Sequence, residues 1–201
     1  MAPQPKPKSI AYLNLLLYRP AVPELDGTKP YEEMILAFAL QGEHEHDAAI
    51  DPKLPTSQRR DDMAAQGCFV WDCFENHGLW KEAIDLLIEK LSHYELVVCF
   101  TPQNLTTTLL RHEIIQNQTI GYKVFNLFDV LQQARFYHPA IKRGLTLQRL
   151  ETALFDEAKL FEHSRILLEA TSNDLISYQQ VREDLIAENE IVAKTYQLLF
   201  K

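Results

Sequence analysis

The first apolar segment of the chain restricts the folds that are open to it. Residues 9–18 read SIAYLNLLLY, an almost continuous apolar run in which hydrophobic and polar residues do not alternate. A strand buried on one face alternates, whereas a strand covered on both faces is apolar throughout. The run is also too short for a helix that spans a bilayer, which takes about 20 residues. We therefore expect a central strand whose sheet is covered on both faces.

Two further segments of strand length follow before any helical pattern begins. They are EMILAFALQ at 33–41 and CFVWDCF at 68–74, and Pro-containing polar segments separate the three strands. Successive strands without helices between them pair antiparallel. Apolar residues then recur every three or four positions over 79–92, which is the pattern of a helix packed on one face.

Strands and helices alternate in the rest of the chain. ELVVCF at 95–100 and YKVF at 122–125 have strand length, and each is followed by a helical pattern, so both should join the sheet in parallel. Residues 145–201 contain neither Gly nor Pro and should be helical. The sequence thus predicts an α/β fold with a mixed sheet of about five strands, three antiparallel and then parallel additions, flanked by helices and ending in a helical C-terminus.

Length, charge and cysteine count narrow the classes of function. We expect residues 1–8 to be a flexible lead-in and residues 9–201 to form a single domain. The formal net charge is −8, so any binding to nucleic acid or to an anionic membrane must depend on a local basic patch. The sequence has no predicted membrane span or secretion signal, and its three cysteines lack CxxC spacing. These features are typical of a cytoplasmic protein with reduced thiols.

Four segments resemble, in order and spacing, the motifs of the DEDD-type 3′–5′ exonucleases, which have the ribonuclease H-like fold. SIAYLNLLLYRP resembles the first motif, VVCFTPQNLTTTLLRHEI the second, FNLFDVLQQARFYHPAIKRGLTLQRLETAL the segment after it, and LIAENEIVAKTYQLLF the last. The resemblance covers nearly the whole chain. It implies a ribonuclease H-like domain over residues 9–201.

The resemblance also implies that the active site is degenerate. In this family four carboxylates hold two divalent cations, because Mg²⁺ and Mn²⁺ require anionic oxygen ligands. The matching positions here are Asn14 and Leu16 in the first motif, Thr106 in the second and Glu190 in the last, so one carboxylate remains. We therefore expect no catalytic residue, no bound metal and no cofactor in this pocket.

A basic segment offers a way to contact nucleic acid. Residues 103–144 contain five basic and two acidic side chains, and cations interleave with aromatic residues in ARFYHPAIKRG. Such surfaces contact phosphates and stack on bases. The alternative is that the aromatic residues belong to the core and the cations to a solvated loop. The candidate nucleic-acid-binding residues are Arg111, Arg135, Lys142 and Arg143.

The sequence therefore predicts a catalytically inactive exonuclease-like domain. We expect it to be a structural or nucleic-acid-contacting subunit of a nucleic-acid-processing complex, with other protein subunits as partners, single-stranded nucleic acid as a candidate ligand, and no membrane. One alternative is an active exonuclease with relocated ligands, in which Asp129 or Asp72 binds Mg²⁺ or Mn²⁺ together with Glu190. The other alternative is an adaptor that contacts only proteins.

Overall fold

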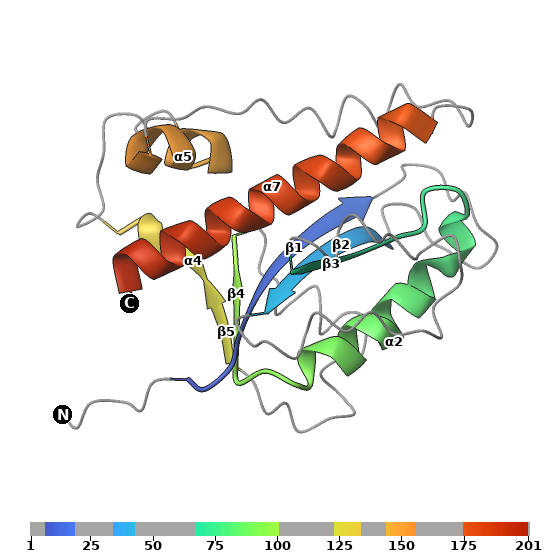
Figure 1. Cartoon of the computed structure of the whole chain (residues 1–201), viewed down its shortest axis with the longest axis horizontal. Helices are drawn as coiled ribbons and strands as arrows, with labels where there is room; N and C mark the ends of the chain where they lie inside the picture. Colours follow the sequence, from blue (N-terminus) through green and yellow to red (C-terminus); the bar gives the residue numbers. More distant parts are fainter. Residues whose placement is uncertain are drawn as a thin grey trace.

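A five-stranded mixed sheet forms the centre of the structure (Figure 1). The computed structural model describes residues 7–18, 34–42, 67–100, 123–133, 144–155 and 175–200. The strands are β1 (Ile10–Tyr18), β2 (Met34–Gly42), β3 (Cys68–Asp72), β4 (Leu96–Cys99) and β5 (Lys123–Asn126). Each strand matches a predicted segment to within two residues at either end, which confirms the prediction of an α/β fold with a mixed sheet.

The sheet order is β3-β2-β1-β4-β5, with β1 in the centre. β1 pairs antiparallel with β2, and β2 pairs antiparallel with β3. β4 joins β1 in parallel, and β5 joins β4 in parallel. The expected arrangement of three antiparallel strands followed by two parallel additions is therefore confirmed.

Side chains cap the first turn of two of the helices. The helices are η3 (His77–Leu79, one 3₁₀ turn), α2 (Trp80–Leu91), α4 (Leu127–Leu131), α5 (Leu147–Phe155) and α7 (Leu175–Phe200). The Asn126 side chain accepts a hydrogen bond from the backbone N–H of Phe128 at the start of α4. The Thr146 hydroxyl accepts one from the backbone N–H of Arg149 at the start of α5. Both side chains satisfy amide groups that have no partner within the helix.

Helices α2 and α7 cover opposite faces of the sheet (Figure 1). The side-chain nitrogen of Asn189 in α7 lies 4.0 Å from the sulfur of Cys68, and the amine of Lys90 in α2 lies 5.2 Å from the ring centroid of Phe69. Cys68 and Phe69 are neighbours in β3, and neighbouring strand residues point to opposite faces. The apolar β1 is thus covered on both sides, as its sequence predicts.

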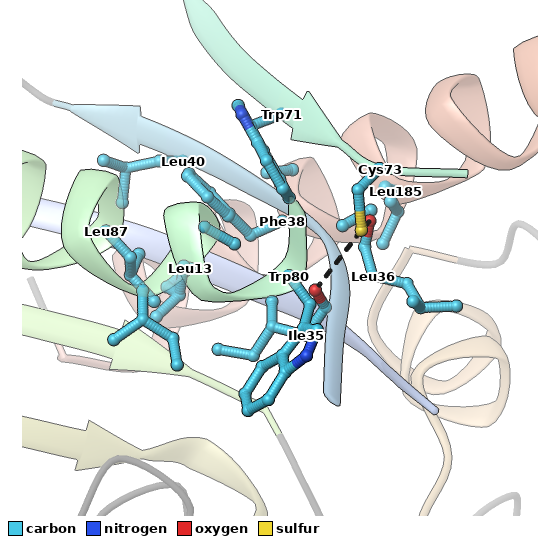
Figure 2. Close-up of a cluster of buried hydrophobic side chains, with 14 of the residues drawn as sticks. Leu13, Ile35, Leu36, Phe38, Leu40, Trp71, Cys73, Trp80, Leu87 and Leu185 are labelled. Atoms are coloured by element: carbon cyan, nitrogen blue, oxygen red, sulfur yellow. Dashed lines mark hydrogen bonds between the residues drawn. The ribbon is translucent and has the colours of Figure 1, made fainter. Parts of the chain in front are cut away.

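The core on the α2 face is built from large apolar side chains (Figure 2). Leu87 of α2 is fully buried in the same cluster as Leu13 and Leu40, which pair across β1 and β2. Phe38 of β2 stacks on Trp71 of β3, with ring centroids 6.0 Å apart. The helical pattern predicted over 79–92 therefore supplies the face that packs on the sheet.

No helix that the structure describes is both long enough and apolar enough to cross a membrane. The longest described helix, α7, has 26 residues, and several charged side chains interrupt its apolar positions. The helical pattern expected after 95–100 lies outside the described residues, as does part of the helical segment expected over 145–201.

Candidate functional site

Helix α7 crosses the sheet and contacts β1, β2, β3 and β4 (Figure 1). Three of its polar side chains bind partners in the strands below: Arg182 binds Asp72, Glu188 binds Asn14, and Asn189 binds the backbone of Tyr12. These contacts follow one another along the helix from β3 to β1. The middle one lies at the position where the first exonuclease motif is predicted.

Asn14 and Glu188 form a direct hydrogen bond between β1 and α7. The Asn14 side-chain nitrogen donates to a Glu188 carboxylate oxygen at 2.6 Å, and both side chains are half-buried. A hydrogen bond to a charged acceptor is stronger than one between neutral groups. Asn14 therefore offers the carboxylate a neutral donor at the position where the resemblance implies a second carboxylate.

In the structure, the carboxylate that contacts Asn14 is that of Glu188. The motif resemblance instead assigns Glu190 to the last motif. Two residues along a helix are about 200° apart around its axis, so the two side chains leave α7 in different directions. Glu190 is half-buried, and its charge acts on Cys68 of β3. Both Glu188 and Glu190 lie three or four residues from buried residues of α7, so this spacing does not distinguish them. The contact of Glu188 with Asn14 joins residues 174 positions apart.

Leu16 and Asp72 lie in one row of the sheet. Leu16 pairs with Ala37, and Ala37 pairs with Asp72 on the next strand, so all three side chains point toward the α7 face. Leucine offers a cation no ligand, so at this position β1 contributes an apolar side chain to the packing beneath α7.

Asp72 is bound by Arg182 through two parallel hydrogen bonds. The Arg182 Nη2 atom donates to one carboxylate oxygen at 2.8 Å, and its Nε atom donates to the other. The Arg182 and Asp72 side chains are 6% and 16% exposed. The guanidinium carbon of Arg182 also lies 5.5 Å from the ring centroid of Phe74. Both oxygens of a carboxylate that the alternative function would use for metal binding are thus engaged by a buried cation.

Asp129, the other candidate for a relocated ligand, is exposed at the start of α4. One of its carboxylate oxygens accepts a hydrogen bond from the side-chain nitrogen of Asn126 at 3.0 Å. The Asn126 side chain thus contacts both the backbone N–H of Phe128 and the carboxylate of Asp129 in the first turn of α4. The Asp129 carboxylate thus holds the side chain that caps α4, which is a structural role.

Several predicted site residues lie outside the described part of the chain. Thr106 of the second motif is one of them, as are the candidate nucleic-acid-binding residues. The latter are Arg111, Arg135, Lys142 and Arg143. Within the described residues, no three His, Cys, Asp or Glu side chains are grouped so that they could hold a metal ion.

All three cysteines are free and buried. Burial, as the largest cause, raises the pKa of each thiol from 9.0 to about 12. The Cys73 sulfur faces the backbone oxygens of Ile35 at 3.8 Å and Leu36 at 3.5 Å (Figure 2). Because a thiol reacts as the thiolate, these groups are poor nucleophiles and poor metal ligands near neutral pH.

No family model matches the sequence, and no curated protein matches it either.

The buried ion pair leads to a first prediction. Replacing Arg182 with Met leaves the Asp72 carboxylate without its cation and should lower the free energy of unfolding by about 3 kcal/mol. The variant that combines Arg182→Met with Asp72→Leu should be more stable than Arg182→Met alone, because no buried charge is then left without a partner. Urea denaturation measures both differences.

The matched control is Lys194→Met, which removes a cation from an exposed position of the same helix. It should change the free energy of unfolding by no more than about 0.5 kcal/mol. A loss for Arg182→Met as small as that of the control would contradict a buried, energetically coupled pair.

The buried thiols lead to a second prediction. Below pH 9 a cysteine is neutral in both the folded and the unfolded chain, and above pH 9 the unfolded thiol ionises first because its pKa is lower. Each thiol therefore makes a contribution to stability that is complete below pH 9 and is lost as pH rises toward 12. In urea denaturation between pH 8 and pH 10, Cys99→Ala should lose less stability than the unaltered chain. If the free energy of unfolding falls equally with pH in the two proteins, the pKa of Cys99 is not raised in the folded chain.

Proposed function

We propose that this chain is a ribonuclease H-like domain of the DEDD exonuclease type whose pocket no longer supports metal-dependent catalysis. The support for the fold is the order of its elements. Three antiparallel strands are followed by α2, by two strands added in parallel, and by a long helix across the sheet. This is the order in which the resemblance places the four motifs.

The observation that carries the proposal is the hydrogen bond between Asn14 and Glu188. In an exonuclease of this type, carboxylates of the first strand and the last helix face each other across two cations. Here a side-chain N–H donates directly to the helix carboxylate at 2.6 Å. An N–H group is a donor and cannot ligate a cation, and here it contacts the carboxylate from the side of β1.

The side chains around this pair support the same proposal. Leu16, two residues further along β1, offers no oxygen ligand to a cation. Asp72 shares its row but has both oxygens bound by Arg182. A metal site rebuilt from Asp72 would first have to break a buried ion pair. These contacts count against the alternative of an active enzyme with relocated ligands.

The function that we propose is that of a non-catalytic subunit in a nucleic-acid-processing complex. The domain would contribute its shape, its partner-binding surfaces and the basic segment that carries Arg111, Arg135, Lys142 and Arg143. Arginine and lysine side chains at such a surface would contact phosphates, and the neighbouring aromatic residues would stack on bases. The step from fold to function rests on analogy with the exonuclease family.

The pair at the pocket leads to a third prediction. Asn14→Asp places a second carboxylate against Glu188 and replaces a hydrogen bond with repulsion. In EDTA this variant should unfold at a lower temperature than the unaltered chain, by several degrees if the change costs about 1–2 kcal/mol. Adding Mn²⁺ should recover part of that loss, because two facing carboxylates can share a cation.

The control for this prediction is Asn14→Leu, which removes the hydrogen bond without adding a charge. Its unfolding temperature should fall in EDTA and should not respond to Mn²⁺. The unaltered chain should not respond either. A rise in the unfolding temperature of the unaltered chain with Mn²⁺, absent from Glu188→Gln, would show a working metal site and overturn the proposal.

A fourth prediction concerns nucleic acid directly. A 5′-labelled single strand of DNA or RNA should remain intact when incubated with the chain and either Mg²⁺ or Mn²⁺, and it should be retarded on a native gel. Combined replacement of Arg135, Lys142 and Arg143 by Ala should weaken the complex and reduce its sensitivity to salt.

The outcomes of this assay separate the three functions. Cleavage that disappears in Glu188→Gln or in Glu190→Gln would identify an active exonuclease. An intact strand that is not retarded would favour an adaptor that contacts only proteins. An intact, retarded strand whose binding depends on the three cations supports the proposed subunit.

A further inference from the structure

Three side chains form a row on the face of the sheet beneath α7. Tyr12 of β1 pairs with Gln41 of β2, and Gln41 pairs with Cys68 of β3. Residues paired in this way across antiparallel strands point to the same face. Gln41 therefore presents its carboxamide between Tyr12 and Cys68, on the face that α7 covers.

Asn189 of α7 lies directly over this row. Its side-chain nitrogen donates to the backbone oxygen of Tyr12 at 2.9 Å and lies 4.0 Å from the sulfur of Cys68. Gln41 stands between Tyr12 and Cys68 in the row, so the contacts of Asn189 with both of these residues place Asn189 above Gln41. Asn189 is 0% exposed.

Both carboxamides have an oxygen atom that is buried and still lacks a donor. Neither Asn189 Oδ1 nor Gln41 Oε1 accepts a hydrogen bond from any residue in the described ranges. Turning the Asn189 amide would not help, because its oxygen would then face the Tyr12 oxygen. Buried polar atoms without a partner are rare in folded proteins, and ordered water commonly satisfies them.

We propose that one ordered water molecule bridges Gln41 Oε1 and Asn189 Oδ1 beneath α7. Water carries two O–H donors, which matches two amide oxygens that each need one. A metal cation would need about six oxygen ligands, and this cluster offers two. The site thus selects a small donor molecule over an ion.

The water molecule would add a second polar contact between α7 and the sheet, and we call the two contacts together the polar clamp. Asn189 already holds the helix to the backbone of β1, and the bridge would extend that hold to β2. The clamp lies beside the Asn14–Glu188 pair and does not depend on the function proposed for that pair. Its failure would leave the argument about metal chemistry unchanged.

The test is the detection of water held by the folded chain. In NMR spectra of the unaltered full-length chain, the side-chain amide protons of Asn189 should show a cross-peak to a long-lived water molecule. A rotating-frame spectrum separates this signal from proton exchange. The cross-peak should be lost in Gln41→Met, which keeps the length of the side chain and removes its oxygen. It should persist in Gln133→Met, an equivalent change at an exposed position.

Two results would overturn the proposal. If the unaltered chain shows no such cross-peak, the two carboxamides bind each other directly after rotation of the Gln41 amide. If the cross-peak is unchanged in Gln41→Met, the water molecule does not depend on Gln41. The measurement on the unaltered chain decides the first point even if the Gln41 variant fails to fold.

Discussion

The position of α7 on the sheet depends on polar side chains that cannot remain buried without partners. Three side chains of α7 face the sheet and bind it: Arg182, Glu188 and Asn189. Arg182 binds Asp72 of β3, and the other two bind Asn14 and Tyr12 of β1. An apolar helix can slide or rotate on an apolar sheet at little cost. A buried charge or amide that loses its partner costs far more, so these three contacts select one register for the helix.

That register determines which side chains meet at the candidate site. With α7 held by Arg182 near β3 and by Asn189 near β1, the residue between them that faces Asn14 is Glu188. A rotation of the helix that brought Glu190 to β1 would remove Asn189 from the Tyr12 oxygen and Arg182 from Asp72. The side chains available at the candidate site therefore follow from contacts that lie on either side of it.

The sequence predicted those parts of the fold that depend on local patterns. All five strands could be predicted because each is a short apolar run between polar segments. The pairing of Asp72 with Arg182 could not be predicted, because the two residues are 110 positions apart and the chain contains many opposite charges. The Asn189 contact has no sequence signal, since its acceptor is a backbone oxygen. The motif spacing assigns Glu190 to the last motif, and the contact of Glu188 with Asn14 could not be predicted because it joins residues 174 positions apart.

The contact between Asn14 and Glu188 also bears on how such a domain would tolerate the loss of its metals under the proposed function. Facing carboxylates repel each other when no cation lies between them, so an active site of this kind is a source of instability in the free chain. Replacing one carboxylate with an amide turns the repulsion into a hydrogen bond to a charged acceptor. A change that ends catalysis would then also stabilise the packing of the last helix on the central strand. Residues at catalytic positions often lower stability, and a protein kept for its surfaces is free to exchange them for residues that raise it.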